Sequence, residues 1–228
     1  NSNSYQQLED EYHQELQHYV DTYGYYDLFL IDTEGNVLYS VAKESDLGSN
    51  LATGTYQDSG LARAYRQGLK GTTITDFTNY EPSNGPAAFI SAPVRAKDSN
   101  ELLGVVALQV PIEEINEIMQ EQAGLGQTGE TYLVGSDYLM RSDSRFSESS
   151  TIFKRKVKTS AAKAALQGEA GIEVIDDYRG VEVLSAYAPV EILGQNWAIL
   201  AEVDQAEIMA PVNTLLQGCL IIALVVLL

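Results

Sequence analysis

The chain has 228 residues, 45% hydrophobic and 20% charged, a composition typical of folded domains rather than disordered chains. Its 14 basic and 32 acidic residues give a net charge of −18 at pH 7, which excludes nucleic acid as a natural partner. A single cysteine, Cys219, and two histidines, His13 and His18, exclude an internal disulfide and a zinc, iron–sulfur or histidine-based centre, so we expect no metal.

Residues 1–24 carry the pattern of an amphipathic stalk helix. Apolar and aromatic residues recur every three or four positions, while acidic residues fill the other faces; the recurring residues are Leu8, Tyr12, Leu16, Tyr19, Val20 and Tyr23. This stripe predicts that the helix covers one face of a sheet or pairs with a second copy of the chain.

Short β segments follow Gly24. Segments 25–32 and 36–43 flank a T-E-G-N turn and predict a hairpin. A loop with helical patches covers 45–69. Three further strands are predicted at 72–80, 86–94 and 102–110.

The second half of the chain repeats this order. Segment 29–40 (FLIDTEGNVLYS) is echoed by 132–142 (YLVGSDYLMRS), and 90–94 (ISAPV) by 186–190 (AYAPV). Each copy predicts an α+β unit with an antiparallel sheet of about five strands and helices. Between the sheet and its helical insert we expect a cup, where small ligands commonly bind.

We expect five segments: a stalk helix at 1–24, a first unit at 25–111, a connecting helix and hinge at 112–130, a second unit at 131–207, and a C-terminal helix at 208–228. The uncharged run CLIIALVVLL predicts that the last segment enters a membrane, of which it would cover about half the thickness. A short buried helix is the alternative. Because the chain does not begin with methionine, we also expect an upstream segment.

Three glycines, Gly124, Gly126 and Gly129, match the G-x-G-x-x-G pattern of dinucleotide-binding loops. Such a loop follows a strand and opens a helix, whereas this one follows a predicted helix and precedes a predicted strand. We interpret it as a hinge between the units, and we expect no cofactor.

Candidate ligand-binding residues gather around the cup of the first unit. Aromatic walls with one carboxylate and one guanidinium suit a small zwitterion or organic anion. The candidates are Tyr39, Tyr56, Arg63, Tyr65, Asp76, Tyr80, Asn84, Phe89 and Ser91. The alternative is that each is simply a wall or surface residue.

A second candidate site lies in the second unit. Strand alternation would put Arg141, Asp143 and Arg145 on one side. These three residues form either a self-satisfied salt-bridge cluster or a second anion site.

The residues resemble a known family. The stretches FLIDTEGNVLYSVAKESDLGSNL, NYEPSNGPAAFISAPV and GLGQTGETYLVGSDYLMRSDSRF are similar to the double Cache (PAS-like) extracellular sensor of bacterial transmembrane receptors, most like methyl-accepting chemotaxis proteins. The resemblance implies a first membrane helix before the stalk helix, a membrane-distal and a membrane-proximal unit, and a ligand in the distal one.

Amino-acid-binding members carry an R-x-W-Y-like signature on the insert, followed by a Tyr and an Asp. Arg63, Tyr65, Asp76 and Tyr80 fall in roughly those places, but ARAYRQ has no Trp. The resemblance therefore leaves amino acids, amines and organic acids as ligand classes.

From these features we expect a non-catalytic sensing domain on the periplasmic side of the inner membrane, acting as a homodimer. A histidine kinase or nucleotide cyclase is the alternative output. An extracytoplasmic enzyme that uses carboxylates and a ligand-free dimerisation module are the rival functions.

Overall fold

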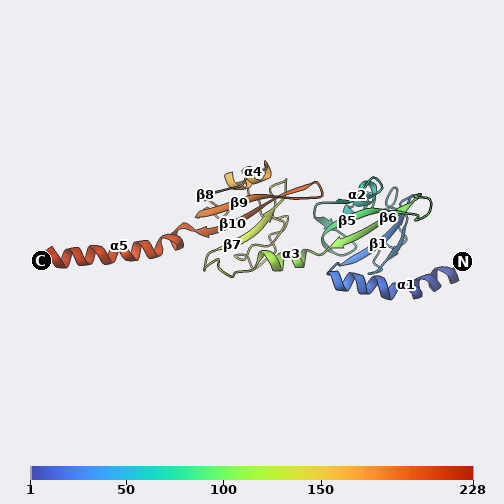
Figure 1. Ribbon diagram of the computed structural model, residues 1–228, viewed down its shortest axis with the longest axis horizontal. Coiled ribbons are helices and arrows are strands. Elements are labelled where there is room, and N and C mark those ends of the chain that lie inside the picture. Colours follow the sequence, from blue (N-terminus) through green and yellow to red (C-terminus); the bar gives the residue numbers. More distant parts are fainter. Residues whose placement is uncertain (1, 228) are drawn as a thin grey trace. The chain divides into compact units, whose positions relative to one another are not determined.

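The computed structural model describes residues 2–227 (Figure 1), which form two compact units: residues up to 115 with 192–195, and 116–191 with the remainder. The fold is α+β, as predicted. In chain order the elements are α1 (Ser2–Tyr23), β1 (Asp27–Asp32), β2 (Val37–Ser40), α2 (Gly60–Gly68), β3 (Thr73–Ile74), β4 (Thr78–Tyr80), β5 (Gly85–Arg95), β6 (Leu102–Val110), α3 (Ile112–Met119), β7 (Glu130–Val134), α4 (Ser160–Leu166), β8 (Gly171–Asp176), β9 (Glu182–Ile192), β10 (Gln195–Asp204) and α5 (Gln205–Leu227).

The first unit is built on one antiparallel sheet. Its strands lie in the order β2-β1-β6-β5-β3, and β4 pairs with β5. β1 and β6 pair without interruption from Asp27↔Gln109 to Asp32↔Gly104. Residues directly opposite each other on paired strands point to the same face. Asp27 and Gln109 are therefore neighbours at one end of the sheet.

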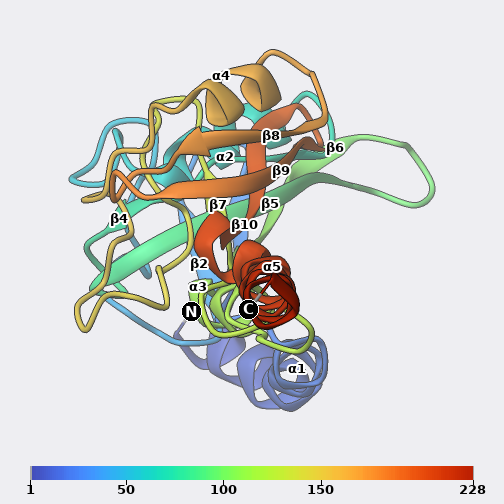
Figure 2. The same ribbon diagram turned by 90° about the vertical axis from the view of Figure 1, so that its left-hand side faces the viewer.

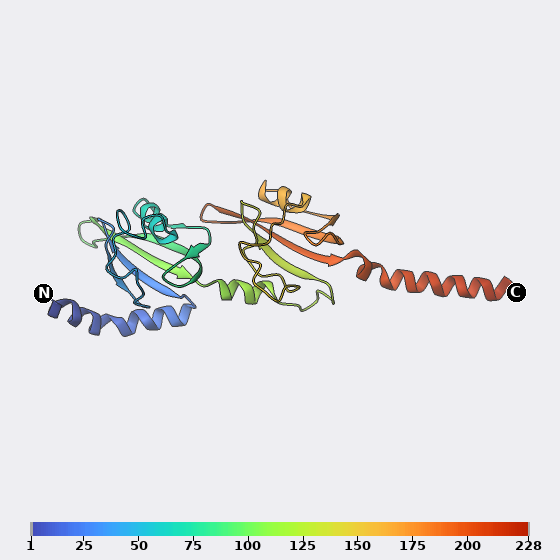
Figure 3. The same ribbon diagram turned by 180° about the vertical axis from the view of Figure 1, so that it is seen from behind.

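Helices cover the two faces of this sheet. Figures 1 and 3, from opposite sides, show α1 along one face and α2 over the other. α1 packs through Val20 against Leu28, Tyr39 and Val41. The larger hydrophobic core lies beneath α2.

Two irregularities change which face a side chain meets. The predicted strand 72–80 forms only β3 and β4, because the Thr75 hydroxyl accepts a hydrogen bond from the amide of Phe89 (3.1 Å) in place of a backbone carbonyl. Asp76 lies in this break, so the predicted alternation of Ile74, Asp76 and Thr78 along one strand is wrong. In β2 a shift of register places Val37 and Tyr39 on opposite faces.

The second unit contains a sheet in the order β7-β10-β9-β8, one strand fewer than predicted. The expected second strand of its hairpin makes only isolated bridges, Val134↔Met140 and Leu139↔Lys156. α4 lies over β8 and β9 in Figure 2, and its alanines pack in a core with Val157 and Leu200.

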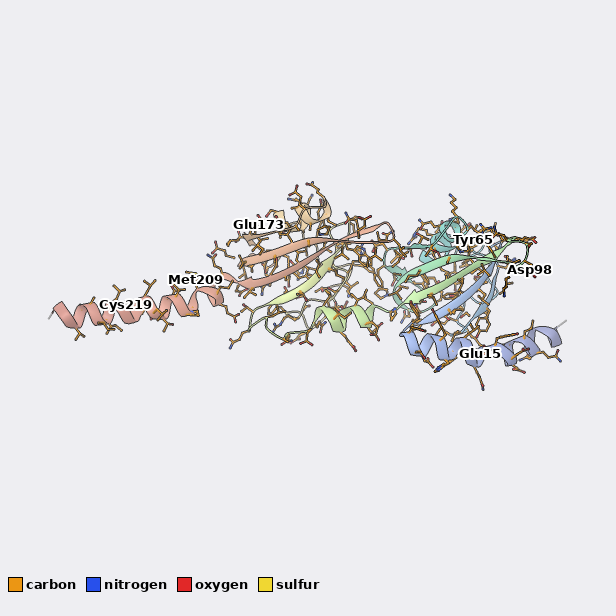
Figure 4. All side chains as sticks on the ribbon, in the orientation of Figure 1. Glu15, Tyr65, Asp98, Glu173, Met209 and Cys219 are labelled. Atoms are coloured by element: carbon orange, nitrogen blue, oxygen red, sulfur yellow. The ribbon has the colours of Figure 1, made fainter. Side chains whose placement is uncertain are left out.

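α5 follows β10 directly. Its stretch Gln205–Val225 has a mean hydropathy of 2.0 and is long and apolar enough to cross a membrane. Met209 and Cys219, labelled in Figure 4, project from this helix and are exposed. Pro211 lies inside the helix and donates no backbone hydrogen bond.

Candidate ligand site

The centre of the predicted cup is packed with aromatic side chains. Tyr80 and Phe89 meet edge to face, with ring centroids 4.9 Å apart, and Phe89 meets Phe29 at 6.1 Å. All three are at most 1% exposed, and Tyr65 joins the same core. The prediction of a hollow chamber at this point is therefore wrong, because side chains from α2, β1, β4 and β5 fill it.

Four of the candidate residues have hydrogen bonds that hold the insert in place. Ser91 donates to the carbonyl of Ala64 (2.8 Å), and Tyr65 to the carbonyl of Thr33 (2.9 Å). The Tyr56 and Ser45 hydroxyls are 2.7 Å apart. The Arg63 guanidinium donates to the carbonyl of Asp58 (3.0 Å) and the hydroxyl of Thr78 (3.1 Å). These hydrogen bonds give the polar groups of all four side chains a partner within the protein, so none of them requires a ligand.

The remaining candidates lie apart from this core. Tyr39 faces α1, where its hydroxyl is 2.7 Å from Nδ1 of His13, so its predicted place in the cup is wrong. Asn84 is an exposed turn residue with a φ of +52°, a conformation that asparagine tolerates well. Asp76 is half-buried, and one of its oxygens accepts the amide of Phe77 (2.8 Å).

A buried polar cluster, which the sequence analysis did not identify, lies at the end of the sheet where β1 begins and β6 ends. We call it the first-unit cluster, and it consists of Asp27, Glu44, Asp46, Tyr80 and Gln109. Asp27 and Asp46 are fully buried, Tyr80 and Gln109 are at most 2% exposed, and Glu44 is half-buried. Only Tyr80 was among the predicted site residues.

Asp27 is the most completely bonded acid of this cluster. One of its oxygens accepts the amides of Leu28, Val41 and Ala42 at 2.7–3.0 Å, and the other accepts the Ser40 hydroxyl at 2.7 Å. Its carboxylate thereby fixes the chain that leaves β2. Burial nevertheless raises the pKa of Asp27.

The rest of the first-unit cluster has fewer donors than acceptors. Tyr80 donates to Oδ2 of Asp46 (2.5 Å), Tyr26 to Oε1 of Glu44 (2.7 Å), and Nε2 of Gln109 to the Ser83 hydroxyl (2.9 Å). Three buried oxygens have no hydrogen-bond partner among the described residues: the second carboxylate oxygens of Asp46 (Oδ1) and Glu44 (Oε2), and the amide oxygen of Gln109 (Oε1).

The carboxyl groups of the cluster bring negative charge together without a positively charged partner among the described residues. Burial, with the charges of Asp27 and Glu44, raises the pKa of Asp46 to about 6 against the opposing hydrogen bond from Tyr80. Burial and the charge of Asp46 likewise raise the pKa of Tyr80. The nearest lysine in sequence, Lys43, forms its ion pair with Glu9 of α1 instead.

The second unit has a buried acidic pair at the corresponding strand register, Glu130↔Glu202 on β7 and β10. Both residues are at most 2% exposed, and burial raises the pKa of each. Here every carboxylate oxygen has a donor: Tyr178 (2.5 Å) and Ser144 (2.9 Å) for Glu130, and Tyr132 and Ser185 (both 2.8 Å) for Glu202.

The predicted second site does not form as a unit. Arg141 pairs with Asp137 (3.0 Å) and stacks over Phe153. Asp143 accepts the Ser150 hydroxyl (2.9 Å) and the Thr151 amide (2.6 Å), and so orders its own loop. Arg145 donates to the carbonyl of Gly129 and to Gln122 (3.3 Å). Each of the three residues thus has partners outside the trio, and no ion pair joins them among the described residues.

The glycine-rich loop 124–129 does hold an anion, which is a side chain of the chain itself. The amides of Gln127 and Thr128 each donate to the Glu207 carboxylate at 2.8 Å, and the Thr128 hydroxyl also donates to it. Gly126 has a φ of +69°, and a Cβ there would collide with the same carboxylate. The loop therefore clamps the first turn of α5.

Two tandem α+β units, each with a helix-covered antiparallel sheet, followed by a long apolar helix, define a double PAS-like fold. The Cache-domain family model dCache_1 matches residues 1–212, so the chain belongs to this family. No curated protein sequence matches the chain.

Solved structures share the fold. The ligand-binding domain of the amino-acid chemoreceptor PctC of Pseudomonas aeruginosa PAO1, in complex with GABA, is 18% identical with a TM-score of 0.55, covering 79% of this chain and 74% of that one. The ligand-binding domain of PctB of the same organism, in complex with L-Arg, is 16% identical with a TM-score of 0.56, covering 85% and 72%. The extracellular domain of rpHK1S-Z16, described as a histidine kinase, is 15% identical with a TM-score of 0.62, covering 87% and 78%.

Proposed function

We propose that this chain is the sensing domain of a bacterial inner-membrane receptor and that it binds a small metabolite in its first, membrane-distal unit. Membership of the Cache family and the apolar α5 support the receptor assignment. The choice of unit rests on the grouping of three unpartnered buried acceptors in the first unit, whereas the second unit has one among the described residues, Oε1 of Gln205. A buried acceptor without a donor costs free energy, which a ligand that supplies donors recovers.

The output we propose is chemotaxis, with the chain as part of a methyl-accepting chemotaxis protein. The likeness to PctB and PctC supports this output, while the likeness to rpHK1S-Z16 supports a histidine kinase as the alternative. In either case the two units lie in the periplasm and act by binding rather than catalysis, with α5 as the exit helix.

Signalling requires that the ligand prefer one conformation of the first unit, because equal affinity for two states shifts neither. The resulting change in the conformation of the first unit then has to be transmitted to α5. We propose that the loop 124–129 takes part in this step, since its two amides and one hydroxyl hold Glu207.

A second copy of the chain is the partner that we propose for α1. A groove of about 440 Å³ lies between this helix and the sheet, lined in part by Leu8, Tyr12 and Leu38. Leu8 and Tyr12 are 57% and 48% exposed. If the first unit bound no ligand, this groove would favour the rival function of a dimerisation module.

The test is thermal denaturation of the full chain in nanodiscs of zwitterionic lipid, with amino acids, amines and organic acids as separate panels. A ligand at a hundred times its dissociation constant stabilises by about 2.7 kcal/mol, which raises the melting temperature by about 5–10 °C. Stabilisation by no panel, with a concentration-dependent dimer, would instead favour the dimerisation module. Chemical turnover of a bound compound would favour the enzyme.

A further inference from the structure

We infer that the first-unit cluster binds the ammonium group of a primary amine that carries no carboxylate beside it. This inference rests on the proposed function, because it names the ligand class of that same site. It differs from the amino-acid class, which combines an ammonium with a carboxylate.

The first argument is the count of donors and acceptors. The cluster leaves three acceptor oxygens unpartnered among the described residues, on Asp46, Glu44 and Gln109. An alkylammonium has three N–H donors and no acceptor. Asp46 is 0% and Gln109 2% exposed, so these oxygens are withdrawn from bulk water. An ammonium thus matches these unpartnered oxygens in the kind of group that they lack.

The second argument is charge. Asp27 and Glu44 are close enough to Asp46 for their charges to act on it, so three carboxyl groups share one buried region. Within residues 2–227, no lysine or arginine forms an ion pair with any of the three. A cation is attracted to such a region, and a ligand carboxylate is repelled.

The third argument is the position of Arg63. This residue is the natural partner for a ligand carboxylate, because guanidinium groups bind carboxylates with two parallel hydrogen bonds. Its guanidinium instead holds the carbonyl of Asp58 and the hydroxyl of Thr78. These two bonds fix the orientation of the guanidinium and leave fewer of its five N–H donors for a ligand carboxylate.

Glu44, together with the hydrogen-bond partners Tyr26 and Ser83, lies on the surface side of the cluster. Glu44 and Ser83 are half-buried, and Tyr26, which donates to Glu44, is 42% exposed. The polar groups therefore run from the surface to the fully buried Asp46. We expect an ammonium to enter along these groups, with the rest of the amine nearer the surface.

The experiment compares each amine with the amino acid from which decarboxylation would produce it: putrescine with ornithine, cadaverine with lysine, and tyramine with tyrosine. Calorimetric titration of the full chain in zwitterionic nanodiscs gives the affinities. We expect at least one amine to bind ten times or more tightly than its parent amino acid. Tighter binding of the parents, or of organic acids only, would overturn this inference but leave the proposed function standing. Binding of no compound would contradict both.

Variants separate the cluster from the general negative charge of the chain. Asp46→Asn and Gln109→Leu should each weaken amine binding at least tenfold, and either variant suffices if the other fails to fold. Asp98→Asn is the matched control, since Asp98 is exposed and labelled in Figure 4 on the loop between β5 and β6. Equal weakening by all three variants would show that the amine is attracted by the general negative charge of the chain. Loss of wild-type binding in 0.5 M salt would show the same, and either result would overturn the inference.

Discussion

The two units place buried polar side chains at the same point of the same strand pairing, Asp27↔Gln109 in the first and Glu130↔Glu202 in the second. In the second unit four hydroxyl groups satisfy the four carboxylate oxygens. In the first, neighbouring acceptors on Asp46, Glu44 and Gln109 have no donor among the described residues.

This difference separates two uses of buried acids. A satisfied network rigidifies a fold, whereas a partly satisfied one costs stability until another molecule completes it. Under the proposed function, the buried acids of β7 and β10 stabilise the second unit by themselves, whereas the first unit is completed by its ligand.

The largest effect is expected in the second unit. Glu202→Ala leaves the hydroxyls of Tyr132 and Ser185 buried without an acceptor and opens a cavity. We expect a loss of about 3–5 kcal/mol in the free energy of unfolding, measured by urea denaturation. Glu202→Gln is the control and should lose about 1 kcal/mol, since it keeps one oxygen acceptor. A loss below about 1 kcal/mol in Glu202→Ala would show that the second unit does not depend on this hydrogen-bond network.

In the first unit we expect a substitution to raise the free energy of unfolding instead of lowering it. Asp46→Asn removes a buried charge and adds an N–H that can donate to the neighbouring acceptors, so the unliganded chain should gain about 1–2 kcal/mol at pH 8. Differential scanning calorimetry without ligand measures this gain, with Glu130→Gln as the matched variant of the second unit, expected to be destabilising. Destabilisation by both substitutions would show that the units do not differ.

The pH dependence gives a third test. Because the pKa of Asp46 is raised to about 6, the folded chain takes up a proton between about pH 4 and 6 that the unfolded chain lacks. The contribution of Asp46 to stability without ligand therefore falls as the pH rises through this window. Amine binding needs the ionised carboxylate, so affinity should fall about tenfold per pH unit below 6.

The pH dependence of stability and that of amine affinity are each measured as the difference between the wild-type chain and Asp46→Asn. This subtraction removes the contributions of Glu130 and Glu202, whose pKa values are also raised. An identical pH profile in the two proteins would contradict the role of Asp46 together with the groups that face it, Asp27, Glu44 and Tyr80.

A smaller effect is expected where the second unit meets its exit helix. Glu207→Gln keeps one acceptor for the amides of Gln127 and Thr128 but removes the charge, and should weaken these hydrogen bonds. Amide hydrogen exchange at residues 127 and 128 should become faster, while ligand affinity stays unchanged. Unchanged exchange would show that the loop does not depend on this carboxylate.

The smallest effect is expected on the far face of the first sheet. Tyr39→Phe removes the hydroxyl that meets His13, and should cost about 0.5–1 kcal/mol without changing ligand affinity. Calorimetry of unfolding and titration with the bound amine measure the two quantities. Loss of affinity would restore Tyr39 to the ligand site, against its position facing α1.

Much of the fold was predictable, because periodicity and the internal repeat report directly on sheets and helices. The α+β class and the covering of one sheet face by α1 followed from such patterns. The strand at 72–80 could not be predicted correctly, since the Thr75 hydroxyl substitutes for a backbone acceptor. The register shift in β2, which turns Tyr39 to the other face, leaves no mark in the sequence either.

The candidate site was less predictable. Aromatic residues such as Tyr65 and Phe89 suggested ligand walls, but the same residues serve equally well as core. The first-unit cluster joins residues far apart in sequence, and only the β1–β6 register brings Asp27 to Gln109. One signal was available: Gln109 interrupts the apolar run VVALQV at a position that faces inward.

Pro211 gives α5 a mechanical property. Because this residue lacks an amide hydrogen, the carbonyl of Glu207 has no helical donor, and bending costs less here than elsewhere in the helix. The joint lies one turn beyond the clamp on Glu207. We expect the helix to bend at Pro211 when its first turn tilts, so that the tilt is not transmitted. A displacement along the helix axis is transmitted to the rest of α5. If α5 crosses a bilayer, as its length and composition allow, we expect it to transmit a piston-like stroke rather than a lever-like swing.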